Sequence, residues 1–126
     1  GIANTSGLLL SSTVTTEDSK ITENFTNGLG GGGILNVDLT PNLGGTANLT
    51  IRNSEITKNK ATLGGGIRNT NGTLTPTNTR ITNNTALTTN GGGGINTNTT
   101  ITTDPTTTTT SNRPTNCTGT VTNCFG

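Results

Sequence analysis

Histidine, methionine, tryptophan and tyrosine are absent from the 126 residues of the chain, and phenylalanine occurs only twice. Without histidine, nucleophilic catalysis of the usual Ser-His-Asp or Cys-His type is excluded. A hydrophobic fraction of 25% is also too small for an ordinary globular core, because little apolar surface is available to offset the entropy lost on ordering. The chain must therefore be disordered or fold around a thin core.

Charge is also scarce, at 10% of the residues and a formal net charge of +1. Disordered chains of low hydrophobicity usually carry many charges, so this scarcity favours a folded chain. The seven Lys and Arg residues are scattered, which argues against a nucleic-acid partner. The longest aliphatic run is Leu8-Leu9-Leu10, far short of the roughly 18 apolar residues that span a bilayer, so we expect no membrane insertion.

Threonine, asparagine and glycine dominate instead. Threonine is β-branched and suits strands, asparagine can stack amide on amide along a ladder, and glycine permits tight corners. This mixture favours a β-solenoid, which buries a thin core between stacked coils.

Two motifs recur in alternation along the chain. Gly-Gly-Gly-Ile occupies residues 31–34, 64–67 and 92–95, and the third copy departs by placing the next asparagine one step early. The second motif, Asn/Asp-Ser/Thr-x-Ile-Thr-x-Asn, occupies residues 18–24, 53–59 and 78–84. A period of about 25 to 35 residues with about three strand-like pieces fits one coil of a β-helix.

The stretches between the motifs alternate apolar and polar residues, as half-buried strands do. Ala47, Leu49 and Ile51 form the clearest example, and Leu8, Leu10 and Val14 are expected to begin the first coil. The segment 37–45 contains Pro41 and Gly44-Gly45. We interpret it as a loop inserted at a corner of the second coil.

The sequence therefore predicts an all-β fold, a right-handed parallel β-helix of about four to five short coils. Residues 1–96 would form the repeated coils, and residues 97–126 a Thr-rich last coil or edge segment. Inward isoleucines of successive copies would stack about 4.8 Å apart. The two predicted columns are Ile21, Ile56 and Ile81, and Ile34, Ile67 and Ile95.

The asparagines and glycines of the motifs have two interpretations each. Asn24, Asn59 and Asn84 would form an amide ladder, or would serve only as corner residues, since asparagine tolerates the left-handed conformation. The glycines before each isoleucine would keep two walls close together, or would adopt positive φ at a bend.

The C-terminal segment is rich in threonine, and its order is left open: low complexity indicates disorder, whereas β-branched threonine suits a last coil. Ile101 would continue an inward column. Cys117 and Cys124 are the only cysteines and are expected to form a disulfide that seals the final coil, because two sulfurs without histidine cannot complete a zinc shell. The sequence predicts no metal site.

These motifs resemble those of exported bacterial right-handed parallel β-helix repeat proteins, and polymorphic outer-membrane proteins carry a similar Gly-Gly-Gly-Ile repeat. The best-matching stretch is residues 49–69, and the Asn-x-Pro-Thr-Asn-Cys ending looks like the extreme C-terminus of such proteins. The resemblance implies surface adhesins, passenger domains or cell-wall components, and some relatives degrade polysaccharides. The chain departs from the pattern in lacking the aromatic residue that often follows the glycine-isoleucine motif.

Catalysis would have to rely on carboxylates, which number six. They are Glu17, Asp18, Glu23, Asp38, Glu55 and Asp104. Only Glu17 and Asp18 are expected to approach Glu23 or Glu55 across neighbouring coils. Basic residues such as Lys20 and Arg80 occupy variable positions of the repeat, as solvated charges do. The sequence predicts no catalytic residue and no cofactor, and hence no enzyme.

The function that we expect is an extracellular structural or adhesive β-solenoid, secreted to the cell surface. Exposed end strands would let subunits associate end to end into a homo-oligomer or a filament. The alternative is a polysaccharide-binding module that contacts a cell-surface glycan through a Thr/Asn-rich face. Ice binding and polysaccharide degradation are weaker versions of that alternative.

Overall fold

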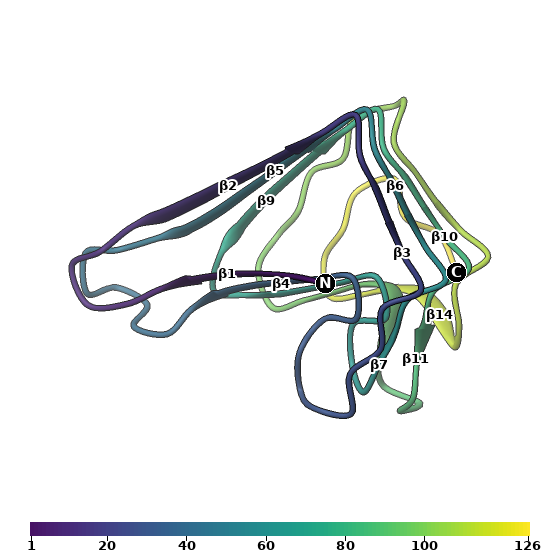
Figure 1. Ribbon diagram of the computed structural model, residues 1–126, viewed down its shortest axis with the longest axis horizontal. Coiled ribbons are helices and arrows are strands. Elements are labelled where there is room, and N and C mark those ends of the chain that lie inside the picture. Colours follow the sequence, from purple (N-terminus) through teal and green to yellow (C-terminus); the bar gives the residue numbers. More distant parts are fainter.

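The computed structural model describes residues 1–126, and its regular structure consists of β-strands alone. The fourteen strands are β1 (Ile2–Ser6), β2 (Ser12–Glu17), β3 (Lys20–Thr22), β4 (Ile34–Asp38), β5 (Ala47–Arg52), β6 (Glu55–Thr57), β7 (Lys60–Ala61), β8 (Ile67–Thr70), β9 (Thr73–Thr77), β10 (Arg80–Thr82), β11 (Thr85–Ala86), β12 (Gly92–Thr97), β13 (Thr108–Thr110) and β14 (Thr115–Thr118). Figure 1 shows a triangular outline, with β1 and β4 along one side, β2, β5 and β9 along the second, and β3, β6 and β10 along the third.

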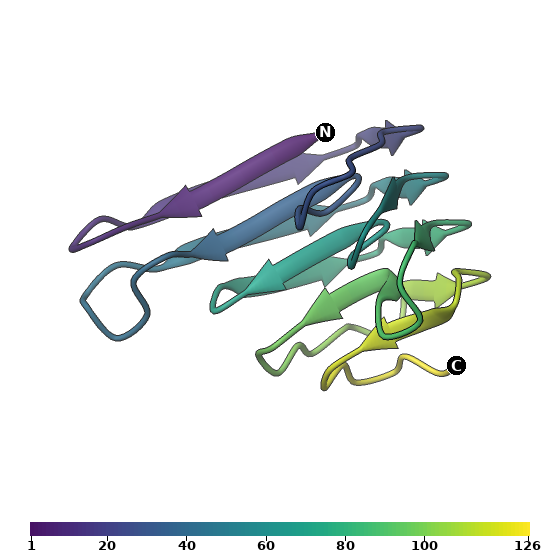
Figure 2. The same cartoon turned by 90° about the horizontal axis from the view of Figure 1, so that it is seen from below.

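All strand pairs are parallel. The strand orders of the three larger sheets are β1-β4-β8-β12-β14, β2-β5-β9 and β3-β6-β10-β13, and β7 pairs with β11 in a small fourth sheet. Figure 2 shows the resulting layers one above another, with the N-terminus in the first layer and the C-terminus at the opposite end. The predicted all-β class and parallel sheets are confirmed, and the small fourth sheet is an addition to the three strand-like pieces expected per period.

Isoleucines from successive repeats lie in register inside the stack. Ile56 pairs with Ile21 on one side and with Ile81 on the other, and Thr109 takes the next position. The second column follows the same rule and consists of Ile2, Ile34, Ile67, Ile95 and Cys117. The central isoleucines of both columns are fully buried. Side chains alternate along a strand, so only every second residue points inward. Stacking these inward residues from layer to layer makes a continuous core from a small number of apolar side chains.

The substitution Ile81→Val is expected to lower the free energy of unfolding by about 1 kcal/mol, because it deletes one buried methyl group from a site that cannot fully close. Ile81 is 0% exposed and sits in the core cluster between neighbouring layers. Chemical denaturation followed by far-ultraviolet circular dichroism measures the change. An effect below about 0.3 kcal/mol would mean that this column is loosely packed.

The glycines of the Gly-Gly-Gly-Ile motif provide close approach between backbones. The three glycines with φ in the left-handed region are Gly44, Gly119 and Gly126, none of which belongs to the motif. A Cβ added to Gly65 would lie 2.5 Å from the carbonyl oxygen of Gly93 and 2.6 Å from the backbone of Thr85. Of the two interpretations of these glycines, close wall packing is therefore correct and positive φ at a bend is wrong.

The start of the first layer differs from the sequence prediction. Leu8 and Leu10 do not belong to a strand. They lie in the turn after β1, where the two residues are 59% and 70% exposed. The first layer begins with β1 instead, and only Val14 packs against the core as expected. In the second layer, the predicted insertion is a loop after β4, and its Leu43 carbonyl oxygen accepts a hydrogen bond from the Leu9 nitrogen.

The Thr-rich C-terminal segment is ordered and belongs to the last two layers. Within it, β13 pairs with β10 and β14 pairs with β12. Ile101 is buried and forms a parallel bridge with Val121. Of the two possibilities that the sequence leaves open, the structure therefore shows ordered layers for this segment.

Candidate functional site

The predicted asparagine ladder is present and longer than expected. The Nδ2 atom of Asn24 donates to Oδ1 of Asn59 (2.9 Å), and that of Asn59 donates to Oδ1 of Asn84 (3.0 Å). The ladder continues from Asn84 to Asn112 (3.0 Å). Each accepting Oδ1 atom also receives the backbone N–H of the asparagine before it. Asn112 was missed because Thr109 replaces the isoleucine that marks the motif.

The left-handed corner positions precede the ladder rather than belonging to it. Glu23, Lys58, Asn83 and Ser111 have φ between 57° and 59°, and each is followed directly by a ladder asparagine. The corner therefore turns the chain, and the next residue points its carboxamide inward. Corner chemistry alone does not account for Asn24, Asn59 and Asn84.

A second, buried ladder follows the isoleucines of the other motif. Nδ2 of Asn4 donates to Oδ1 of Asn36 (2.7 Å), and Nδ2 of Asn36 donates to Oδ1 of Asn69 (2.7 Å). Nδ2 of Asn69 then donates to Oγ1 of Thr97 (3.1 Å), because Thr97 occupies the register position of an asparagine. The sequence signal was the Ile-x-Asn spacing, which is shared by Ile2 and Asn4.

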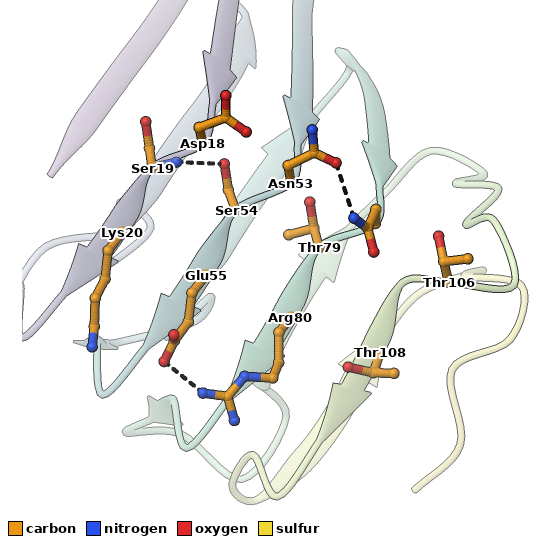
Figure 3. A pocket seen from close by; sticks show the side chains of 11 residues that line it. Asp18, Ser19, Lys20, Asn53, Ser54, Glu55, Thr79, Arg80, Thr106 and Thr108 are labelled. Atoms are coloured by element: carbon orange, nitrogen blue, oxygen red, sulfur yellow. Dashed lines mark hydrogen bonds and ion pairs between the residues drawn. The ribbon is translucent and has the colours of Figure 1, made fainter.

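The outer face of the β3-β6-β10-β13 sheet carries a shallow groove of about 640 Å³ that is lined without any hydrophobic residue. Lys20, Glu55, Arg80 and Thr108 lie in register on neighbouring strands. Figure 3 shows the first three side chains next to one another on this face. The fold thus gathers charges that are 25 to 35 residues apart in sequence into one row.

The corner beside this row forms the rim of the groove. Asp18, Asn53 and Asn78 have φ between 44° and 49°, a conformation that short polar side chains tolerate. Nδ2 of Asn78 donates to Oδ1 of Asn53 (2.9 Å). Below the rim, the Ser19 nitrogen donates to Oγ of Ser54 (3.2 Å). The rim therefore offers fixed amide and hydroxyl groups to a polar ligand.

The charges of the groove are largely exposed. Arg80 donates to Glu55 across 2.7 Å, with 57% and 29% of the two side chains exposed. Such a pair stabilises the fold by at most about 1 kcal/mol. Glu23 pairs with Lys58 (3.8 Å), and Glu17 lies in register with Arg52. Glu17, Glu23 and Glu55 therefore each lie beside a basic residue on a neighbouring strand or corner, not beside another acid.

Asp104 lies in the corner next to this groove. The side-chain hydroxyl of Thr106, followed by that of Thr107, donates to its carboxylate and lowers the pKa of Asp104 to about 2. The backbone N–H of Asn78 contributes a smaller effect of the same sign. Because the folded pKa is lowered, the stabilising contribution is present above the ordinary pKa and is lost as the pH falls through about 2.

Cys117 and Cys124 form the predicted disulfide. The enclosed loop carries Val121, which packs against the core.

Reducing the disulfide is expected to lower the free energy of unfolding by about 2 to 3 kcal/mol, because a short closed loop is released in the unfolded chain. Thermal unfolding with and without a reductant measures this. The double variant Cys117→Ser/Cys124→Ser should show no response to the reductant, and equal stability of oxidised and reduced protein would contradict the prediction.

The structure gathers no cluster of three or more histidine, cysteine, aspartate or glutamate side chains suited to a metal ion. It also contains no helix that is long and apolar enough to cross a membrane. The polar and charged lining of the groove offers hydrogen bonds and charge to a ligand. The chain matches no known family model, no curated protein and no solved structure, and the resemblance to exported β-helix repeat proteins stays a prediction.

Proposed function

We propose that the chain is a right-handed parallel β-helix of about four to five short coils. The support is the repeated order of the sheets: the first three layers each add one strand, in register, to the same three parallel sheets, and the later layers extend two of those sheets. Right-handed crossovers are the rule for parallel strands joined within one sheet. An experimental structure with left-handed turns, or with strands that do not close into coils, would remove this proposal.

The function that the structure supports best is an extracellular structural or adhesive module. The observation that carries it is the pair of asparagine ladders, which join every layer to the next through buried hydrogen bonds. These ladders make the stack stiff along its axis, because fully satisfied buried amides must stay in register. A stiff stack suits mechanical support or display at a surface.

Exposure outside the cell is supported by the disulfide, since such bonds persist in oxidising compartments. Gold-labelled antibodies on intact source cells test this part of the proposal. Labelling of intact cells is expected. Labelling that appears only after permeabilisation would exclude a surface role. Beads coated with the protein, compared with beads coated with its heat-unfolded form, would test adhesion.

The alternative function is polysaccharide binding, and the polar groove is the observation that favours it. Lys20 forms no ion pair, and Arg80 pairs with Glu55 while 57% of its side chain stays exposed. The row therefore offers cationic groups to the carboxylates of an acidic glycan. The variant Lys20→Ala/Arg80→Ala should then weaken binding to polyuronate at least tenfold. Arg52→Ala is the control, because Arg52 lies on β5 in another sheet. Equal binding by both variants would exclude the groove.

A further inference from the structure

Three of the six buried side-chain polar atoms that lack a hydrogen-bond partner lie at one corner of the fold. They are the hydroxyl oxygens of Ser6, Ser12 and Thr40. Figure 1 shows this corner at the left end of the molecule, where the side that contains β1 and β4 meets the side that contains β2 and β5. The narrow corner comprises residues 6–12 of the first layer and residues 38–47 of the second. Buried polar atoms are usually paired, so this concentration requires an explanation.

A buried carboxylate lies among these hydroxyls. Asp38 is only 3% exposed and ends β4, directly beside Ser6 at the end of β1. Both side chains point inward, because each residue lies two positions after an asparagine of the buried ladder, Asn4 or Asn36, and side chains two apart on a strand share a face. The backbone nitrogen of Thr40 donates to Oδ1 of Asp38 (3.0 Å). The carboxylate therefore has a serine on the neighbouring strand and a threonine in the following loop beside it.

Ser12 belongs to the opposite wall of the narrow corner. It lies in register with Ala47, which is fully buried, so both side chains point inward. The Ala47 carbonyl oxygen accepts a hydrogen bond from Nδ2 of Asn36 (3.2 Å), which crosses the corner. The two walls therefore approach each other two residues away from Asp38.

The carboxylate of Asp38 has no positive partner within the fold. Neither of the two ion pairs of the chain includes it. Its Oδ1 accepts one hydrogen bond, from the Thr40 nitrogen, and its Oδ2 accepts none. A buried charge is costly unless it is paired or coordinates a metal ion. The narrow corner thus combines an uncompensated negative charge with three unpaired hydroxyl oxygens.

The group that satisfies these atoms must be small. The surrounding residues themselves shield the three hydroxyl oxygens from solvent, so only an ion or a water molecule fits between the side chains. A water molecule would bind the hydroxyls but would leave the charge of Asp38 uncompensated. A cation satisfies the carboxylate and the hydroxyl oxygens together. Oxygen ligands alone favour a hard cation over zinc or copper.

We propose that the narrow corner is a Ca²⁺ site whose ligands are the carboxylate of Asp38 and the three unpaired hydroxyl oxygens. Ca²⁺ accepts an irregular set of oxygen ligands, whereas Mg²⁺ demands near-octahedral geometry and gives up its water reluctantly. A single carboxylate supplies little charge, so the dissociation constant should be about 1 mM, as in extracellular calcium modules. The sequence predicts no metal site, and it gives no signal for this one because serine and threonine are frequent throughout the chain.

Calcium titration of the intact chain tests the proposal. Equilibrium dialysis with radioactive Ca²⁺ should give one bound ion per chain. The melting temperature should rise by about 5 °C when Ca²⁺ reaches ten times its dissociation constant, because the ion binds the folded chain alone. Sodium chloride of equal ionic strength should give no such rise, and Mg²⁺ a smaller one. Absence of bound Ca²⁺, or an equal rise with sodium chloride, would overturn the proposal.

Two aspartate variants form a matched pair for locating the ion. Asp38→Asn should abolish the calcium response, while its amide oxygen can still accept the hydrogen bond from Thr40. Without calcium this variant should be at least as stable as the original chain, because an uncompensated buried charge is removed. Asp18→Asn neutralises an exposed carboxylate outside the narrow corner and should leave the calcium response unchanged. A response retained by Asp38→Asn, or lost by Asp18→Asn, would place the ion elsewhere and overturn the site.

Ser6→Ala tests the hydroxyl ligands while the charge of Asp38 stays in place. This variant should bind Ca²⁺ at least several-fold more weakly than the original chain, and unchanged affinity would remove Ser6 from the site. Should Asp38→Asn fail to fold, dialysis of the intact chain and of Ser6→Ala still decides the proposal. Calcium binding is measured on the purified chain, so its outcome is independent of the labelling of cells and of adhesion.

Discussion

Gly65→Ala is expected to lower the free energy of unfolding by about 3 kcal/mol or more, at the upper end of the range for overpacked positions. The added methyl carbon would lie 2.5 Å from the Gly93 carbonyl oxygen and 2.6 Å from the amide nitrogen of Thr85. Both are backbone atoms of neighbouring strand segments, so no side-chain rotation relieves the contact. The Gly66 nitrogen donates to the Gly93 oxygen in the same place, and a backbone shift would break that hydrogen bond.

Gly28→Ala is the matched control, because the nearest atom to its added Cβ is the Thr26 hydroxyl oxygen at 3.6 Å. This variant should differ from the original chain by less than about 0.5 kcal/mol. Urea unfolding of both variants, followed by circular dichroism, gives the comparison. Similar stabilities of the two variants would show that the motif glycines are needed for reasons other than close packing.

The repeat itself was readable because its physical requirements are local. A glycine that must touch backbone and an isoleucine that must stack over its copy tolerate few alternatives, so Gly64 to Ile67 looks like its copies. The disulfide was similarly constrained, with two cysteines seven residues apart. From the repeat, the all-β class, the parallel pairing of strands and the two isoleucine columns can be predicted.

The missed features are those in which one residue type has several structural roles. Asn4 is buried in a ladder whereas Asn98 is exposed, and nothing in their identity separates them. Leu8 and Leu10 predict the start of the first layer, because apolar residues usually mark strands. In the structure, both residues occupy an exposed turn. Hydrophobicity is a weak guide here, because large apolar side chains such as Leu8 and Leu9 are exposed while many asparagines and threonines are buried beside the core isoleucines.

The candidate groove could not be predicted without knowing the register between strands of neighbouring layers. The sequence predicts that Lys20 and Arg80 are variable, solvated positions of the repeat, but it does not place them beside Glu55. Their alignment into one row depends on the pairing of β3, β6 and β10. The contact between Asn116 and the ladder is still harder to foresee, because Asn116 lies on β14, and its Oδ1 accepts from Nδ2 of Asn112 in the ladder beside another sheet.

The second large effect is expected for Asn84→Ala, which should lower the free energy of unfolding by about 3 to 5 kcal/mol. Oδ1 of Asn84 accepts the backbone nitrogen (2.9 Å) and Nδ2 (3.0 Å) of Asn59, and its Nδ2 donates to the Ile56 carbonyl oxygen (2.9 Å). Asn84 is fully buried. Truncation leaves several buried polar groups unpaired in a place that water reaches poorly, in addition to a cavity.

Asn24→Ala tests the same chemistry at the open end of the ladder, where the side chain is only partly buried. Water can replace the lost partners there, so the expected loss is about 1 kcal/mol. Denaturant unfolding measures both variants, and amide exchange of Asn59 should accelerate more in Asn84→Ala. Equal losses for the two positions would mean that the ladder contributes to stability uniformly along the stack, and the contrast between a satisfied interior and an open end would then have no energetic basis.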